Sequence, residues 1–204
     1  LFSSEFILNN NSEELPSVLF NLGSISFSDQ DGYNRIESDT EGKMQDFGSP
    51  EIPTYSFNYA IDASKEYEVT YTVLDYQIYN DILLYPMQSM NKEKFNQNFI
   101  KNEELYNSPV ILPENNLNVI RQSLRGYQIL GVELIPYEYN PVDKQLKVYN
   151  SVEINIIESG SRNNELNMPR SEIFENIYKN IIINENIYNT DTRDFQNPSI
   201  LYIM

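Results

Sequence analysis

Cysteine, histidine and tryptophan are all absent from this 204-residue sequence. Without cysteine and histidine, the chain cannot contain a disulfide, a thiolate zinc site, a Cys nucleophile or a His-based catalytic triad. These absences exclude most enzyme chemistry, and we expect no catalytic residue, no metal site and no cofactor in this segment. The lack of cysteine does not identify a compartment, because cytosolic proteins and disulfide-free secreted proteins both show it.

Positive charge is also scarce, since 14 Lys and Arg residues stand against 30 Asp and Glu residues, for a formal net charge of −16. Such a chain repels nucleic acid phosphates and anionic lipid headgroups, so we expect no nucleic-acid partner and no membrane insertion. The acidity serves either solubility or steering towards a cationic protein face. No apolar run approaches the roughly 20 residues that span a bilayer, and the layout of a signal peptide is missing. Because the chain starts at Leu1 and not at Met, we expect a processed or truncated piece.

Aromatic and hydrophobic residues are plentiful, with 16 Tyr, 10 Phe and 40% hydrophobic content. Aromatic side chains pack well on a pleated sheet, which predicts a mainly β fold. Alternating apolar and polar residues predict strands at 54–62, 66–74 and 145–157. The short connector "DASK" favours a hairpin between the first two. The alternation places four tyrosines on inward faces: Tyr55, Tyr59, Tyr67 and Tyr71.

Turn residues add detail to this pattern. Asp31-Gly32 lies between two alternating runs and predicts a hairpin, because glycine supplies the positive φ of a tight turn. Asp29 and Asp31 lack the third ligand and the closing Glu of a calcium loop, which argues against calcium. Farther along, a phase shift near Leu130-Gly131 indicates a bulge. Pro136 then ends strand pairing, and Asn140-Pro141 with Asp143 predicts a turn.

One segment has a helical period. In residues 169–183, Ile173, Phe174, Ile177, Tyr178 and Ile181 fall on one face, and Ser171 is the expected N-cap, so we expect an amphipathic helix docked on the sheets. Residues 87–108 show no strong period and predict a long exposed loop with room for a helical turn. The final run "SILYIM" is typical of a strand buried on both faces and suggests an α/β domain that is otherwise absent.

Three motifs follow one another within about residues 32–160: "GSPEIPTYSF", "LLYPMQ" and "LRGYQILGVELIPYEYNPVDKQLKVYNSVEINI". In this order they resemble the propeptide of the gingipain family of cysteine peptidases. Ile52 stands where the family usually has Leu, and the family's inhibitory loop is too variable to align. The terminal "NPSILYIM" is similar to the opening strand of the peptidase domain. The matching positions are Gly48, Pro50, Glu51, Pro53, Arg125, Gly126, Pro136, Tyr139, Asn140 and Pro141. On the residues alone, Arg125 is read as one half of a surface ion pair.

The resemblance implies an antiparallel β-sandwich prodomain over residues 1–183, a processing linker at 184–198, and the start of a peptidase domain at 199–204. Such a prodomain is not catalytic; it acts as an intramolecular inhibitor and folding aid that keeps the enzyme latent until it is cleaved. Its partner would be its own downstream peptidase domain. The resemblance also implies a bacterium with type IX secretion and an exported protein, first periplasmic and then secreted or at the cell surface.

Two kinds of site follow from this resemblance. Gingipain-like enzymes prefer Arg or Lys in their specificity pocket, and the inhibitory candidates in the long loop are Lys92, Lys94 and Lys101. The maturation site would be Arg193 in the polar linker; Arg170 is a weaker alternative because it starts the predicted helix.

Two other functions fit the residues. An adhesive or carbohydrate-binding β-sandwich would use the many tyrosines as stacking surfaces, although the alternation turns several of them inward. The N-terminal domain of a sortase-like relative from the type IX secretion system would resemble a prodomain without having to be removed.

Overall fold

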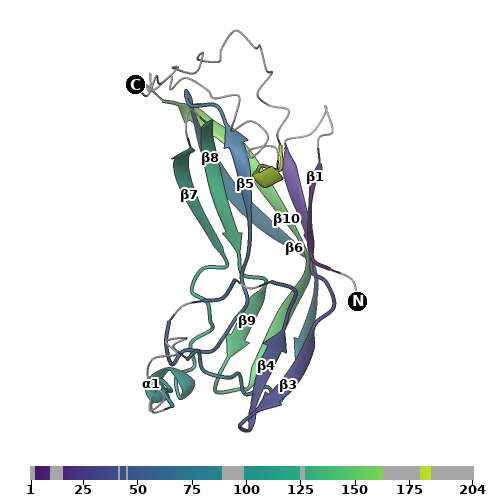
Figure 1. Cartoon of the computed structure of the whole chain (residues 1–204), viewed down its shortest axis with the longest axis vertical. Helices are drawn as coiled ribbons and strands as arrows, with labels where there is room; N and C mark the ends of the chain where they lie inside the picture. Colours follow the sequence, from purple (N-terminus) through teal and green to yellow (C-terminus); the bar gives the residue numbers. More distant parts are fainter. Residues whose placement is uncertain are drawn as a thin grey trace, which may run out of the picture. The chain divides into compact units, whose positions relative to one another are not determined.

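The computed structural model describes residues 3–9, 16–40, 42–44, 46–88, 99–124, 127–162 and 180–184 (Figure 1). Strands dominate these residues, and the pairs β1–β2, β2–β10, β9–β10 and β3–β4 are antiparallel. The mainly β, antiparallel class predicted from the sequence is therefore confirmed. The strands are β1 Glu5–Asn9, β2 Ser17–Asn21, β3 Ser26–Gln30, β4 Tyr33–Glu37, β5 Tyr55–Ile61, β6 Lys65–Tyr79, β7 Leu117–Leu124, β8 Tyr127–Leu134, β9 Tyr137–Asn140 and β10 Gln145–Ser161.

The strands form three sheets. The largest has the order β1-β2-β10-β6, with β9 pairing β10 as a fifth strand. The second sheet has the order β5-β8-β7, and the third is the two-stranded pair β3-β4. Within the described ranges, the chain has no helix with the length and apolarity that a bilayer crossing needs.

The chain divides into two compact units. The first takes its described residues from Leu1–Tyr55, Thr70–Asn118 and Glu133–Asn155, and the second from Ser56–Val69, Val119–Val132 and Ile156–Met204. The core of the first unit includes the fully buried Phe20, Ile52, Tyr137, Tyr139 and Leu146. The buried apolar residues of the second unit include Ile61, Ile129, Val132, Ile156 and Ile182.

The predicted Asp31-Gly32 hairpin is confirmed. It joins β3 to β4, and the φ angles of Asp31 and Gly32 are 55° and 82°. Positive φ at both central residues defines the turn type that matches the twist of paired strands. The predicted turn after Asn140 is present as well: the Asn140 Oδ1 accepts hydrogen bonds from the backbone N–H groups of Val142 and Asp143, at 3.1 and 3.2 Å.

The expected hairpin between 54–62 and 66–74 is wrong. Both segments are strands, but β5 lies in the sheet with β8 and β7, whereas β6 pairs β10. The Arg121 guanidinium, from β7, donates hydrogen bonds to the carbonyls of Lys65 and Ala63 at 2.9 and 3.1 Å. The alternation of apolar residues specifies which face of a strand is buried, but it does not specify the strand's partner.

The inward orientation of the four tyrosines holds to different degrees. Tyr55 and Tyr59 are buried, whereas Tyr67 and Tyr71 on β6 are half-buried. The expected end of strand pairing at Pro136 is confirmed: β8 ends at Leu134, and β9, which begins at Tyr137, belongs to a different sheet. The bulge near Leu130-Gly131 stays a prediction.

Helix is confined to short turns in the described residues. The helix α1, Glu103–Tyr106, begins after the N-cap Asn102, whose side chain accepts a hydrogen bond from the Leu105 N–H, and it confirms a helical turn within 87–108. Most of the predicted helix at 169–183 lies outside the described residues, as do the linker after Asn184 and the strand at 199–204. Ile181 was expected on the buried face, but it is 39% exposed and Ile182 is buried instead. The reason is that the chain pairs with β5 at Ile182 and no longer follows a helical period there.

Candidate functional site

The site begins at the glycine of the motif Gly48–Pro53, which lies in the first unit. Gly48 has a φ of 82°, and a Cβ at this position would lie 3.1 Å from both the Asn102 N and the Ile100 Cγ2. Its N–H donates to the Met87 carbonyl at 2.8 Å, and its carbonyl accepts from the Asn102 N–H at 2.9 Å. Only glycine combines this backbone angle with this close approach. Gly48 therefore connects two stretches that are separate in the sequence, one at Met87 and one at Asn102.

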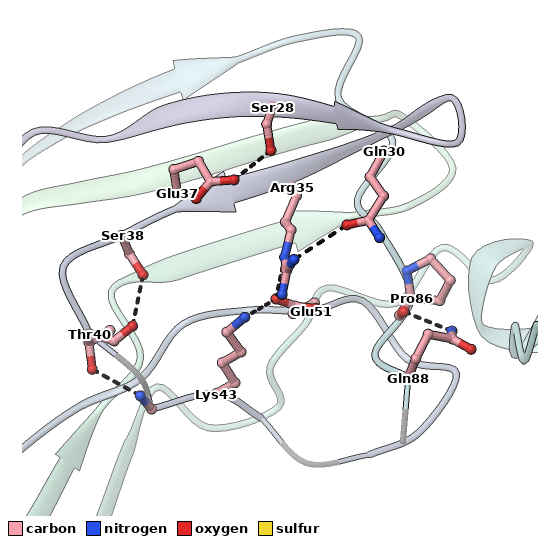
Figure 2. Close-up of polar contacts among 11 residues, drawn as sticks. Ser28, Gln30, Arg35, Glu37, Ser38, Thr40, Lys43, Glu51, Pro86 and Gln88 are labelled. Atoms are coloured by element: carbon pink, nitrogen blue, oxygen red, sulfur yellow. Dashed lines mark hydrogen bonds and ion pairs between the residues drawn. The ribbon is translucent and has the colours of Figure 1, made fainter. Parts of the chain in front are cut away.

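Gln88 ties the same two segments together with its side chain. Its Nε2 donates to the Ile100 carbonyl at 2.7 Å, and its Oε1 accepts from the Ile100 N–H at 3.0 Å. The Nε2 also donates to the Pro86 carbonyl at 2.9 Å (Figure 2). The amide thus pairs with Ile100 as a backbone peptide group would. Gln88 and Ile100, which lie 12 positions apart in the sequence, are thus paired directly. We call residues Gly48–Glu51, Tyr85–Gln88 and Phe99–Asn102 the loop anchor.

A buried carboxylate fixes the motif to β4. The Glu51 side chain is only 6% exposed, and its Oε1 accepts from the Arg35 Nε at 3.0 Å and from the Lys43 Nζ (Figure 2). The Glu51 N–H donates to the Tyr85 carbonyl at 2.8 Å, which links the carboxylate to the loop anchor. A carboxylate taken out of water requires partners of opposite charge, and here two cations supply them. Arg35 belongs to β4, so the ion pairs hold the motif and this strand together.

Aromatic rings support the returning end of the anchor. The Phe99 ring lies 5.6 Å from the Tyr33 ring and 5.9 Å from the Tyr85 ring, measured between centroids. Tyr33 and Tyr85 also meet edge to face at 6.1 Å. Phe99 nevertheless remains 48% exposed and Ile100 44% exposed. Phe99 thus packs against Tyr33 and Tyr85, while about half of its side chain and of the Ile100 side chain remains exposed to solvent.

Lys101 is the one inhibitory candidate that falls within the described residues. Its Nζ lies 2.9 Å from the Glu103 Oε2 and 4.9 Å from the centroid of the Tyr106 ring, and its side chain is 22% exposed. Tyr106 in turn donates its hydroxyl hydrogen to the Leu84 carbonyl at 2.7 Å, and burial raises its pKa. Lys101 is therefore held against the domain's own helical turn. Lys92 and Lys94 lie outside the described residues.

The remaining described residues of the motifs form backbone bridges, buried hydrogen bonds and a turn. Pro50 and Pro53 form isolated bridges with Pro86 and Lys43. Tyr139 is fully buried, and its hydroxyl donates to the Ile82 carbonyl at 3.1 Å and accepts from the Leu84 N–H at 3.2 Å. Asn140 and Pro141 begin the turn between β9 and β10. Four further predicted positions, besides Lys92 and Lys94, lie outside the described residues: Arg125, Gly126, Arg170 and Arg193.

Sequence reasoning missed the partners of the motif. Neither Gln88 nor the pairing of Glu51 with Arg35 and Lys43 had a signal in the residue pattern, because their contacts join distant parts of the chain. Among the described side chains, no group of three or more His, Cys, Asp or Glu residues is arranged to hold a metal ion.

Comparison with known proteins places this fold among the propeptides of gingipain-type cysteine peptidases. The family described as Propeptide_C25 matches residues 17–192, and the chain belongs to that family. It is thus a non-catalytic precursor segment, and the adhesive and sortase-like alternatives are not favoured.

A curated relative and two solved structures give the extent of the similarity. Gingipain R2 of Porphyromonas gingivalis is 23% identical over 186 residues, which is 84% of this chain. The chain spans about a quarter of the length of that relative. A complex of the RgpB pro- and mature domains of P. gingivalis superposes with a TM-score of 0.74 at 20% identity, covering 88% of this chain and 97% of that one. A structure titled for the zymogenic latency of gingipain K, also from P. gingivalis, gives a TM-score of 0.61 at 19% identity, covering 77% and 94%.

Proposed function

We propose that this chain keeps a downstream cysteine peptidase latent, and assists its folding, until a cut between the two domains releases it. The observation that carries the proposal is the loop anchor, because Gly48 and Gln88 hold together the described residues on either side of 89–98. Fixing the ends of a loop lowers the entropy that is lost when the loop binds a partner. The similar RgpB structure is a complex of pro- and mature domains, which supports the peptidase as the partner. Export to the periplasm and then to the cell surface or medium is part of the same proposal.

The inhibitory side chain is proposed to be Lys92 or Lys94. A lysine that blocks a peptidase would place its ammonium in an acidic specificity pocket, where a charge-assisted hydrogen bond holds it. Lys101 already forms an ion pair with Glu103 and lies over the Tyr106 ring. Moving Lys101 into a partner would break both contacts, so it is the least suited of the three.

An inhibition assay tests this assignment. The chain is added in trans to the peptidase encoded after it, and the inhibition constant is compared for wild type, Lys92→Ala with Lys94→Ala, and Lys101→Ala. Loss of one desolvated charge pair costs about 2–5 kcal/mol, so the double variant should inhibit at least roughly 30-fold less well. Lys65→Ala is the matched control, because Lys65 pairs with Glu158 in the second unit. Equal inhibition by the double variant and wild type would show that neither lysine enters the cleft. An unrelated cysteine peptidase should be inhibited less, because a large complementary surface carries the specificity.

The maturation cut is proposed to follow Arg193. Residues 184–198 are polar and unpatterned, and Arg193 is the one basic residue among them. In a precursor that extends through the peptidase domain, Arg193→Ala should slow processing without disturbing folding. N-terminal sequencing of the unmutated mature enzyme should begin at Asp194. Maturation of the variant to the same end at the same rate would refute the assignment.

A further inference from the structure

The edge of β5 in the second unit holds a later segment of the same chain. Asn58 forms a parallel bridge with Ile182, and its carbonyl accepts from the Ile183 N–H at 2.9 Å. The Asn58 Nδ2 also donates to the Ile181 carbonyl at 3.2 Å. Two residues farther along β5, at Ala60, the side chain of Asn184 pairs with the strand in place of a backbone peptide group. The Ala60 N–H donates to the Asn184 Oδ1 at 2.7 Å, and the Asn184 Nδ2 donates to the Ala60 carbonyl at 2.9 Å. We call Ile181–Asn184 the latch.

The latch is a buried part of the second unit. Asn184 is 8% exposed, Ile182 is 5% exposed and Ala60 is fully buried. A side-chain amide offers the same donor and acceptor as a peptide group, so Asn184 completes the edge of β5 where the backbone itself does not pair. Without it, the N–H and carbonyl of Ala60 would be buried and unpaired, which is costly for backbone polar groups. Asn184 is therefore packed as part of the second unit.

The latch begins just after a basic residue, Lys179. A protease cuts only where the residues on both sides of the bond can leave the fold and extend into its cleft, so the rate follows the cost of local opening. Cleavage after Lys179 requires the residues that follow it, beginning with Asn180, to enter a protease cleft. The hydrogen bonds of Ile181, Ile183 and Asn184 to β5 oppose this. Arg193 follows Asn184 in the sequence by about nine residues, so a cut there does not require these hydrogen bonds to break.

We propose that the latch shields the Lys179–Asn180 bond and so directs proteases specific for basic residues to Arg193. Asn184 acts as a positioning residue, since it holds the chain on β5 and takes no part in bond cleavage itself. The inference rests on the proposed function, in which release of the peptidase requires a cut in the linker. It adds the reason why the cut falls in the linker and not at the basic residue just before the latch.

Digestion with a lysine-specific endoprotease tests the latch on the full chain. The cleavage rate after Lys179 is measured by intact mass spectrometry for wild type, Asn184→Ala, Asn184→Asp and the control Asn115→Ala at an exposed loop position. Asn184 forms two hydrogen bonds with Ala60, and each contributes about fivefold to an opening equilibrium. Asn184→Ala should therefore be cut after Lys179 about 25-fold faster than wild type. Asn184→Asp should behave similarly, because a carboxylate cannot donate to the Ala60 carbonyl. The control should match wild type.

The same digest contains an internal reference. Lys147 lies within β10, so cleavage there reports global unfolding; in wild type and in every variant it should stay much slower than cleavage after Lys179, which shows that Lys179 is cut from a locally opened chain. A wild-type rate after Lys179 in Asn184→Ala would overturn the proposal. Amide hydrogen exchange of the unmodified chain gives an independent test, in which the N–H groups of Ala60 and Ile183 should be protected; fast exchange at both would also overturn it. The assay uses a foreign protease and no peptidase domain, so a failure of the latch is distinguishable from a failure of inhibition.

Discussion

Replacing Glu51 by Gln tests the buried ion pairs that hold the loop anchor to β4. The substitution keeps the shape of the side chain but removes its charge, which leaves Arg35 and Lys43 without an anionic partner. Breaking a buried pair from one side costs about 3–5 kcal/mol. The Arg35 side chain is 35% exposed and the Lys43 side chain 16% exposed, so water can partly rehydrate both cations. We therefore expect Glu51→Gln to lower the free energy of unfolding by about 2–3 kcal/mol, just below the range for fully buried pairs.

Urea denaturation followed by circular dichroism measures this change. With a slope of about 2 kcal/mol per molar urea for a chain of this size, the midpoint should fall by roughly 1–1.5 M. Glu158→Gln is the matched control: Glu158 pairs with Lys65 at 3.3 Å, but the two side chains are 57% and 39% exposed. An exposed pair contributes about 0–1 kcal/mol, so the control should shift the midpoint much less. If Glu51→Gln and Glu158→Gln shift the midpoint equally, the reasoning from burial is wrong. Replacing Arg35, Lys43 and Glu51 together by Met should recover most of the loss, because an apolar cluster needs no charge partner.

Three further predictions concern single contacts. Gly48→Ala should destabilise the protein more than Gly32→Ala in the same urea assay: both glycines have a φ of 82°, but a Cβ at Gly48 meets backbone 3.1 Å away, whereas nothing lies within 4 Å of one at Gly32. Equal losses would mean that the close approach at Gly48 is unimportant. Gln88→Glu should speed amide exchange at Ile100, because a carboxylate cannot donate to the Ile100 and Pro86 carbonyls; unchanged exchange would remove Gln88 from the loop anchor. Hydrogen bonds from the Ser64 hydroxyl and N–H hold the pKa of Asp62 below its ordinary value, so Ser64→Ala should raise that pKa in an NMR carboxyl titration. Since a lowered carboxyl pKa stabilises the fold above the unfolded-state pKa, the stability gap between wild type and Ser64→Ala should close as the pH falls through the folded pKa of Asp62; a gap that persists in acid would contradict this.

The sequence predicted those features that depend on neighbours along the chain. Alternation located the strands at 54–62, 66–74 and 145–157, and Asp31-Gly32 and Asn140-Pro141 located two turns, because local backbone angles and burial periods are written in consecutive residues. The partner of each strand was not predictable in this way. Asp62 and Lys65 frame a turn short enough for a hairpin, yet β5 and β6 pair with strands that come much later in the sequence.

The site was predictable only as a motif. Gly48 and Glu51 were singled out by resemblance, but their roles depend on Met87, Asn102, Arg35 and Lys43, which no local pattern connects to them. At the end of the described chain, Ile181 and Ile182 show the same limit. The helical period predicted that Ile181 would be buried, but pairing with the edge of β5 buries Ile182 instead.

Gln88 and Asn184 each use a side-chain amide in place of a strand's backbone, and this makes both attachments vulnerable to chemical ageing. Deamidation converts an amide to a carboxylate of nearly the same shape, and Asn and Gln count among the thermolabile residues for this reason. At Asn184 the product would set a negative oxygen against the Ala60 carbonyl, and at Gln88 against the carbonyls of Ile100 and Pro86. A stored sample would thus lose either attachment one molecule at a time. The mass of each molecule would change by only about one dalton, and the strands would stay in place. The age and storage conditions of the sample are therefore variables to control in any inhibition measurement.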